Sequence, residues 1–258
     1  MKIQKIGFVI IGCALCLILF TQCRIEIEGD GMIRVNNVRL EHKREIHLEE
    51  EFTSDKMAID IGSGDIDLSG SKTHMATLDI IIYEKEPGDA EVYIENGKLK
   101  TRSKGDYPVY ISHVSGTIPE DVAIEFDTGS GDISLKNMRS SKRITLDAGS
   151  GDVSLYNCQE IGEITIETGS GDVFIESLSA IEHLICDTGS GDIKIRDSES
   201  EEVRFDTGSG DVRVLSSKFE EVNADTGSGD IIFDNSSYTS GRFDTGSGDV
   251  IIKKRRHK

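Results

Sequence analysis

A tetrapeptide, Gly-Ser-Gly-Asp, recurs at an almost constant interval through the second half of the chain. Three intervals of 20 between successive copies are followed by three of 19, and one earlier copy stands apart from this series. A fixed period of this length is typical of architectures in which each repeat stacks on its neighbours. The copies occupy residues 129–132, 149–152, 169–172, 189–192, 208–211, 227–230 and 246–249, with the isolated copy at 62–65.

Each repeat predicts two short strands, one on either side of the tetrapeptide. Apolar residues alternate with polar ones, as at Ile144 and Leu146 before the turn and at Val153 and Leu155 after it. This period of two turns one face of each strand inward and the other outward, and it excludes a helix. The pattern weakens before the last turn, where Phe243 is the only apolar residue of the pair.

A single repeat cannot fold alone, because its four apolar side chains contribute roughly 1.5–3 kcal/mol each. Ordering a repeat of this length costs roughly 1–2 kcal/mol for each residue. Stacking removes the deficit by sharing backbone hydrogen bonds and one continuous core. The sequence therefore predicts an all-β fold, a β-solenoid of the β-helix or β-roll kind, built of stacked 19–20-residue coils. The alternative is an antiparallel β meander with Gly-Ser as the hairpin loop, which would oppose Asp127 and Asp132 unfavourably.

The two glycines of each tetrapeptide are interpreted as structural turn residues. Reversing the chain within four residues requires a positive φ, which glycine supplies without steric cost. The flanking Thr and Asp are expected to hydrogen-bond the turn amides. These glycines are Gly129, Gly131, Gly149, Gly151, Gly169, Gly171, Gly189, Gly191, Gly208, Gly210, Gly227, Gly229, Gly246 and Gly248.

Residues 1–23 are interpreted as an export signal of the lipoprotein type. Two lysines in residues 1–5 precede a 15-residue run without charge, which is short for a membrane-spanning helix and suits a signal-peptide core. Cys23 follows in a segment that resembles the lipobox of bacterial lipoproteins, and it is the expected lipidation site, although Gln22 stands where a small residue is usual. Ordinary cleavage and an uncleaved anchor remain the alternatives. The expected location is extracytoplasmic, as a membrane-anchored lipoprotein of the cell envelope or cell surface.

The rest of the chain divides into three parts. Residues 24–121 contain all three prolines and are expected to form irregular β coils and a cap over the N-terminal end of the stack. Residues 122–252 are the regular solenoid repeats. Residues 253–258 form a basic tail.

Charge and motif spacing exclude several classes of function. Asp and Glu outnumber Lys and Arg by 47 to 29, and the formal net charge of −18 argues against a nucleic-acid partner. Asp-Thr-Gly also occurs in aspartic proteases, but that chemistry needs two carboxylates sharing a proton in one cleft. Here the motif recurs from coil to coil, which indicates a structural role. The six histidines lack metal-ligand spacing, and no enzyme is expected.

Calcium binding is the alternative chemical interpretation, with no cofactor as the main expectation. The aspartates form two columns, one before and one after the turn, and stacked carboxylates repel one another unless a cation, a turn amide or salt relieves them. The 19–20-residue period differs from the nonapeptide of calcium-binding rolls. The candidate ligands are Asp127, Asp132, Asp147, Asp152, Asp172, Asp187, Asp192, Asp206, Asp211, Asp225, Asp230, Asp244 and Asp249.

Cys158 and Cys186 are the two cysteines that follow Cys23. They occupy different columns of the repeat, and Cys186 takes the inward place of Leu146 and Ile166. A disulfide between them is therefore not expected, and both are interpreted as packing residues.

The repeated Thr-Gly-Ser-Gly-Asp turns, preceded by Ile118-Pro119-Glu120-Asp121-Val122, resemble the bacterial putative-adhesin domain of unknown function, which includes the LiaG-like envelope proteins. The resemblance covers roughly residues 55–258. It implies a β-solenoid, an extracytoplasmic location and, in some members, a link to envelope stress. The expected function is an exported envelope scaffold or adhesin-like interaction protein without catalytic activity, whose partner is an envelope or surface protein or polysaccharide. The alternative is a cation-binding accessory protein of an envelope-stress response.

Overall fold

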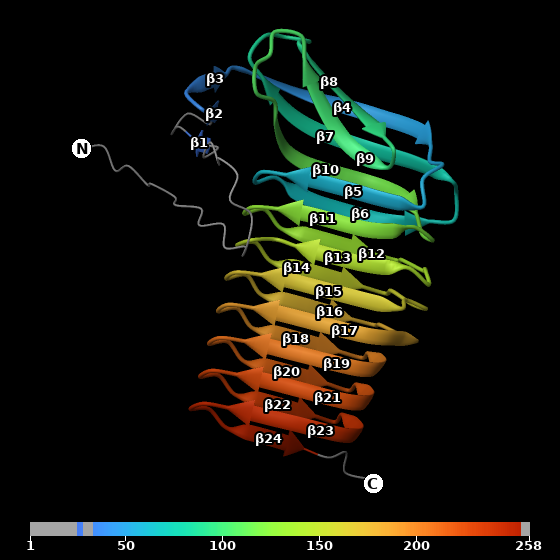
Figure 1. The fold of residues 1–258 in the computed structure, drawn as a ribbon, viewed down its shortest axis with the longest axis vertical. Coiled ribbons are helices and arrows are strands. Elements are labelled where there is room, and N and C mark those ends of the chain that lie inside the picture. The colour runs from blue at the N-terminus through green and yellow to red at the C-terminus, as the bar shows by residue number, and fades with distance from the viewer. Residues whose placement is uncertain (1–24, 28–32, 254–258) are drawn as a thin grey trace, which may run out of the picture.

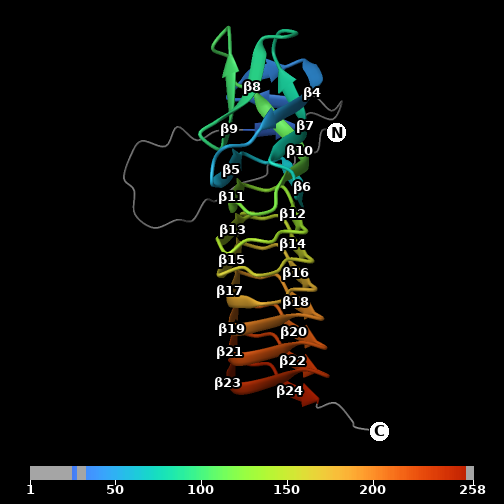
Figure 2. The ribbon, with the colours of Figure 1, turned by 90° about the vertical axis from the view of Figure 1, so that its right-hand side faces the viewer.

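Two long β-sheets face each other along the whole molecule in the computed structural model, which describes residues 25–27 and 33–253. Figure 2 shows the two layers edge-on, one on each side of a narrow core. The first sheet contains β4 (His42–Glu51), β6 (Asp65–Ser71), β7 (Met75–Glu84), β10 (Tyr110–Pro119), β12 (Ile133–Lys136), β14 (Val153–Tyr156), β16 (Val173–Glu176), β18 (Ile193–Arg196), β20 (Val212–Leu215), β22 (Ile231–Asp234) and β24 (Val250–Lys253). The second contains β5 (Lys56–Ile61), β8 (Ala90–Glu95), β9 (Lys98–Ser103), β11 (Ala123–Thr128), β13 (Arg143–Asp147), β15 (Glu163–Thr168), β17 (Ile181–Thr188), β19 (Glu199–Thr207), β21 (Lys218–Thr226) and β23 (Ser237–Thr245).

Each repeat forms one coil, with one strand in each sheet. Strands of successive coils are parallel and in register, so that Ile144, Ile164 and Leu184 lie above one another in the second sheet. Ile133 and Val153 do the same in the first. The β-solenoid prediction is confirmed, with one coil for each copy of the tetrapeptide. The antiparallel meander is excluded for the repeats, because every pairing between their strands is parallel.

The inward positions form one continuous core. One column runs from Leu146 through Ile166, Cys186 and Phe205 to Ala224 after earlier members in preceding coils, and these five side chains are completely buried. Side-chain volumes compensate between columns, as close packing requires. In β21 the small Ala224 takes the place of Phe205 in its column, while Phe219 of the same strand meets the ring of Phe205 edge-on, with ring centroids 6.2 Å apart.

The prediction that the repeat glycines supply positive φ is wrong for nearly all of them. Among these fourteen glycines only Gly149, at 57°, has a positive φ. Close approach is the physical reason for glycine instead. A Cβ added at Gly191 would lie less than 3.0 Å from the carbonyl oxygen and carbon of Gly171 in the preceding coil, and the other turn glycines face their predecessors in the same way. Glycine here allows two backbones to touch.

Positive φ is found at the opposite corner of the coil. Asn157, Ser177, Asp197 and Ser216 follow directly after the first-sheet strands and have φ between 49° and 61°. Asn, Asp and Ser suit this corner, because short polar side chains tolerate the left-handed region better than bulky ones. Two of the 20-residue coils contain a second positive-φ residue, at Glu160 and Ala180, which the following 19-residue coils lack. The change of period is therefore absorbed at this corner.

The isolated Gly-Ser-Gly-Asp at 62–65 belongs to a regular coil of the stack. Its strands β5 and β6 pair in parallel with β11 and β12 of the first contiguous repeat. Strands β7 to β10 fill the long interval in sequence between these coils and lie at the N-terminal end (Figure 1). There β7 pairs antiparallel with β4 and β10, and β8 and β9 form a hairpin in the other sheet. A separate meander, β1 (Ile25–Ile27), β2 (Ile33–Val35) and β3 (Val38–Leu40), has its own small core around Leu40.

Residues 1–24 and 254–258 lie outside the described part, so the signal segment, Cys23 and most of the basic tail are not placed. In the described residues, no helix is long and apolar enough to cross a membrane.

Candidate functional site

The Thr-Gly-Ser-Gly-Asp corner is a ladder of hydrogen bonds between coils. The Thr207 hydroxyl donates to the carbonyl oxygen of Gly191 in the preceding coil at 2.9 Å and accepts the N–H of Gly210 at 3.0 Å. The N–H of Asp211 donates to Oδ1 of Asp192, one coil earlier, at 2.9 Å. Threonine and aspartate thus satisfy the backbone where the chain turns.

The aspartate ladder extends through every Gly-Ser-Gly-Asp corner. Backbone N–H groups donate to the aspartate of the preceding coil at 2.7–3.0 Å. We call this set the inner carboxylate row: Asp65, Asp132, Asp152, Asp172, Asp192, Asp211, Asp230 and Asp249. Its members differ from free carboxylates because one oxygen of each, up to Asp230, already accepts a hydrogen bond.

Cations reinforce the middle of the inner carboxylate row. Lys194 lies 2.9 Å from Asp172 and 3.1 Å from Asp192, and Arg213 lies 3.2 Å from Asp192. Burial alone would raise the pKa of Asp192, but the N–H of Asp211 and the two cations outweigh it and lower the pKa. This part of the row is an ionised structural feature.

A second set of acids precedes the turn and faces outward from the second sheet. We call it the outer carboxylate row, and strand pairing places its members directly beside one another. Burial and the charge of Asp206 raise the pKa of Asp187, and burial with the charges of Asp147 and Asp60 raises that of Asp127. The row contains Asp60, Asp127, Asp147, Glu167, Asp187, Asp206, Asp225 and Asp244.

The structure therefore separates the predicted calcium ligands into two rows on either side of the corner. Within the described ranges, no group of three or more His, Cys, Asp or Glu side chains is arranged to hold a metal ion. The outer carboxylate row offers neighbouring pairs of oxygens. The inner carboxylate row, up to Asp230, uses one oxygen of each member for the backbone.

The outward face of the first sheet has a composition that the sequence analysis did not single out. The rings of Tyr156 and Phe174, from adjacent coils, lie 5.5 Å apart on this face. Further along it lie Lys194, Arg213 and Leu215, the last 42% exposed. The sequence contains a signal for this face, because an apolar residue at an outward, normally polar position of the alternation must point to solvent. This face mixes apolar and basic residues with the acids Glu176 and Asp234, whereas the opposite face carries the outer carboxylate row.

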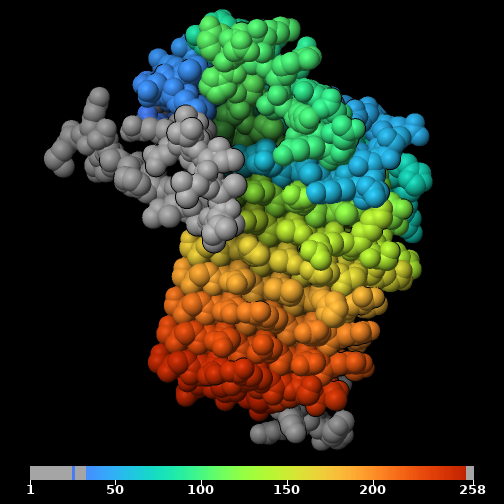
Figure 3. Space-filling view, viewed as in Figure 1, coloured from blue at the N-terminus to red at the C-terminus, as the bar shows by residue number. Residues whose placement is uncertain are grey.

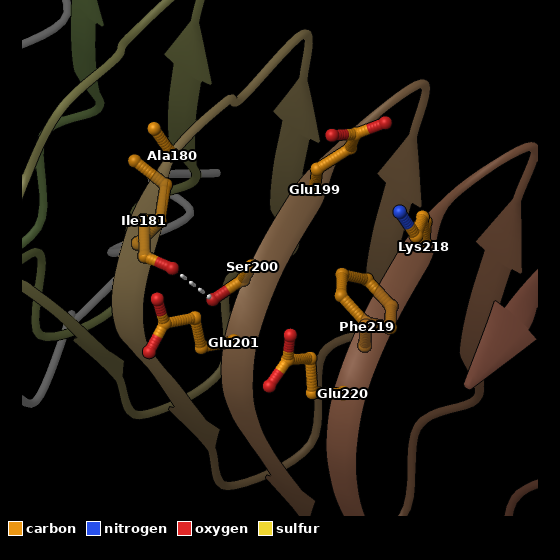
Figure 4. A pocket seen from close by; sticks show the side chains of 8 residues that line it. All are labelled: Ala180, Ile181, Glu199, Ser200, Glu201, Lys218, Phe219 and Glu220. Atoms are coloured by element: carbon orange, nitrogen blue, oxygen red, sulfur yellow. Dashed lines mark hydrogen bonds between the residues drawn. The ribbon is translucent and has the colours of Figure 1, made fainter. Parts of the chain in front are cut away.

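The described surface offers a shallow groove of about 140 Å³ at the corner that joins β17, β19 and β21 to the preceding strands. Figure 4 shows Glu201 and Glu220 side by side along it, with the ring of Phe219 between the coils. The hydroxyl of Ser200 donates to the carbonyl oxygen of Ile181 at 3.1 Å, so it is engaged in joining coils. The face seen in Figure 3 shows closely packed coils without a deep hollow over the repeats.

The two described cysteines are free and buried, as expected for packing residues. Burial raises the pKa of the Cys158 thiol to about 11 and also raises that of Cys186. Both thiols are therefore protonated at neutral pH and inert as nucleophiles.

A buried ion pair at the N-terminal end was not anticipated. Glu84 is 1% exposed and accepts hydrogen bonds from Arg44 at 2.8 and 3.0 Å and from the N–H groups of Gly88 and Ala90 at 2.9 and 2.8 Å. Burial would raise the pKa of Glu84, but these donors outweigh it and lower the pKa. The pair fixes the β7–β8 connection against β4.

The fold and its ladders define a repeat protein of the β-solenoid class, a stack whose recurring motif builds coil corners. The chain belongs to the Toastrack DUF4097 family, which matches residues 92–182 and 158–258. None of the curated proteins matches the sequence.

Several solved bacterial structures match this chain. A putative adhesin from Parabacteroides distasonis superposes with a TM-score of 0.51 at 14% identity, covering 82% of this chain and 96% of that one. A putative lipid binding protein from the same species gives a TM-score of 0.48 at 16% identity, with 82% and 96% covered. A putative adhesin from Bacteroides fragilis gives 0.40 at 16% identity, with 82% and 97% covered.

Proposed function

We propose that this protein is an exported scaffold of the cell envelope that binds a surface partner through its side-chain rows and has no catalytic activity. The observation that carries the proposal is the use of the recurring motif. Its threonines and aspartates are engaged in hydrogen bonds between coils, and the groove at the opposite corner is shallow. Adhesin descriptions of proteins with this fold support the same function.

A rigid stack suits binding because its side chains are held in place before the partner arrives. Preorganised rows lose little conformational freedom on association, which leaves more of the interaction energy for affinity. The first-sheet face around Phe174 is the better candidate for the contact, because a half-buried aromatic pair beside Lys194 resembles the composition of protein interfaces. The outer carboxylate row would keep the opposite face soluble.

Location and binding can be tested separately. Biotinylation of intact cells with a membrane-impermeant reagent should label the protein, and Cys23→Ser should release it from the membrane fraction if Cys23 bears the lipid. A protein that is labelled only after lysis would refute the proposed export.

Capture from envelope extracts tests the binding surface. Immobilised wild-type protein should retain a partner that Phe174→Ser retains at least tenfold less, since aromatic anchors dominate interfaces. Thr165→Ser, on the opposite face, is the matched control and should bind as the wild type does. Equal capture by all three proteins would exclude the face around Phe174.

The second candidate is a cation-binding accessory protein of an envelope-stress response. The mutual repulsion within the outer carboxylate row favours it, because a divalent cation between neighbouring carboxylates would relieve that repulsion. Millimolar Ca²⁺ should then raise the melting temperature, and Asp187→Asn should reduce the rise. A melting curve that is the same in Ca²⁺ and in EDTA would eliminate this candidate.

A further inference from the structure

The C-terminal end of the stack exposes the core that every other coil covers. Ile231 and Phe233 in β22 are completely buried, whereas Val250 and Ile252, which occupy the same two columns in β24, are 42% and 38% exposed. Strands β23 and β24 are the last members of their sheets in the part of the chain that the structure describes. Among the described residues, this end is therefore an open edge of two layers with apolar side chains between them.

The backbone of β24 is already oriented for another strand. The carbonyl oxygens of Asp249 and Lys253 accept N–H groups of β22 and its following corner at 2.9 and 3.0 Å, so these residues point toward the stack. Backbone direction alternates along a strand. The N–H and C=O groups of Val250 and Ile252 consequently point away from β22, toward the open edge. An occupant that satisfies this edge must provide a strand of its own.

We propose that a second copy of this chain covers the edge, joining two stacks end to end through antiparallel pairing of β24 with β24. About Ile251 the sequence Asp249-Val250-Ile251-Ile252-Lys253 is complementary to its own reverse. Asp249 of one copy faces Lys253 of the other on the outside of the sheet. Val250 faces Ile252 on the inside, where the pair covers the exposed core. Opposite charges and apolar side chains are the favourable cross-strand pairs.

The second sheet supports the same arrangement. In β23, Arg242 and Asp244 flank Phe243, so antiparallel pairing about Phe243 places each charge opposite its counterpart in the other copy. Phe243 precedes Thr245 by two residues and Ile251 follows Asp249 by two, so both centres lie at the same distance from the corner. One two-fold axis can therefore serve both sheets, as a symmetric dimer requires.

A single peptide or helix would cover only one of the two edges. The other end of the stack does not match this edge either. There the two sheets end in β4 and β8, which belong to antiparallel pairs, and the elements spread apart (Figure 1). A head-to-tail filament would bring unlike cross-sections together, so the symmetric pair is the favoured assembly.

Disulfide trapping in the full chain tests the register. Ile251 would meet its own counterpart with Cα atoms about 4.5 Å apart, because its backbone groups point toward β22 and the pair is not hydrogen-bonded. That separation permits a disulfide. Ile251→Cys should therefore give a covalent dimer under mild oxidation. Ile232→Cys, at the same outward position one coil earlier, is the matched control and should give no more dimer than the wild type. An Ile251→Cys protein that remains monomeric would overturn the proposal.

Charge reversal provides an independent test by analytical ultracentrifugation. Lys253→Glu places like charges opposite each other twice in the dimer and should weaken it roughly tenfold or more. Combining Asp249→Lys with Lys253→Asp restores the pairing and should restore the dimer. Arg242→Glu should also weaken it, whereas Arg204→Glu should not, although both arginines lie 3.4 Å from the aspartate two residues ahead. A wild-type chain that is monomeric at all concentrations would refute the assembly.

Discussion

Alanine at position 191 should force two coils apart, because the backbone of the preceding coil fills the space that a Cβ needs. The added carbon would lie far closer to the carbonyl oxygen of Gly171 than the 3.4 Å of ordinary contact. Since Gly191 does not have a positive φ, the backbone conformation itself accepts alanine. The substitution therefore measures close approach alone.

The hydrogen bonds at that corner set the magnitude. Thr188 Oγ1 donates to Gly171 O at 3.0 Å, the N–H of Gly191 donates to Thr188 Oγ1 at 3.0 Å, and the N–H of Asp192 donates to Asp172 Oδ1 at 2.8 Å. The bonds to Gly171 and Asp172 join the two coils, and a separation of about 1 Å takes both beyond useful range. At about 1 kcal/mol for the neutral bond and about 2 for the charged one, Gly191→Ala should lose about 3 kcal/mol of unfolding free energy.

Thermal unfolding followed by circular dichroism measures this loss. A destabilisation of about 3 kcal/mol corresponds to a decrease of about 6–12 °C in melting temperature for a domain of this size. Gly162→Ala is the matched control, because its Cβ would meet only the carbonyl oxygen of Ser141, at 3.2 Å, as a close neighbour. It should change stability by less than about 1 kcal/mol. If the two variants melted at the same temperature, the contact between backbones would not be the reason for glycine at these corners.

Two further predictions concern ionised groups, and both are measured by urea unfolding. Asp187→Asn should stabilise the protein by up to about 1 kcal/mol at pH 7, because the raised pKa of Asp187 reflects burial and repulsion by Asp206. Asp192→Asn, by contrast, should destabilise the protein by about 1–2 kcal/mol, because it removes the charge that two cations contact. Glu84→Gln should cost about 2–3 kcal/mol at neutral pH, because it leaves the half-exposed Arg44 without its buried partner. The pKa of Glu84 is lowered in the fold, so its contribution is present above the unfolded pKa of about 4.3 and is lost as the pH falls through the folded value.

Opposite signs for the two aspartates are the critical result. If Asp187→Asn and Asp192→Asn destabilised the protein equally, the distinction between the outer and inner carboxylate rows would be wrong. For Glu84→Gln, the difference from the wild type should shrink below about pH 4. A difference that stayed constant at acidic pH would mean that the ion pair is not its source.

The sequence predicted the stack well because its evidence is local and repeated. The alternation at Ile144 and Leu146 marks inward positions, and the constant period requires equivalent residues to lie in columns. The same repeat pattern was sufficient to place Cys186 in the core column and to exclude a disulfide between Cys186 and Cys158. Both features depend only on position within one repeat.

The role of the glycines could not be predicted in the same way. A glycine needed for positive φ and one needed for close approach look identical in a sequence. Only the distance between Gly191 and Gly171, which belong to successive coils, separates the two explanations. The corner that does require positive φ contains Asn157, Ser177 and Asp197. Because these are three different residue types and none is glycine, a search for turn glycines does not find this corner.

Long-range pairing was the other missing information. Residues 55–71 resemble a repeat, and their strands β5 and β6 pair with β11 and β12. This pairing could not be predicted, because β7 to β10 lie between these strands in the sequence and extend the N-terminal end of the sheets. The pair of Glu84 and Arg44 likewise joins residues 40 positions apart. Because neither contact recurs from coil to coil, no periodic pattern in the sequence predicts it.

The near identity of successive coils has a consequence for the size of the molecule. Each coil contacts the next coil in nearly the same way as it contacts the previous one. A segment one repeat long can therefore be duplicated or deleted without changing either end of the stack. One such event alters the reach of the protein by a single strand spacing, about 4.8 Å. Duplication within the gene can therefore adjust the length of the stack in uniform steps, while the terminal surfaces keep their chemistry.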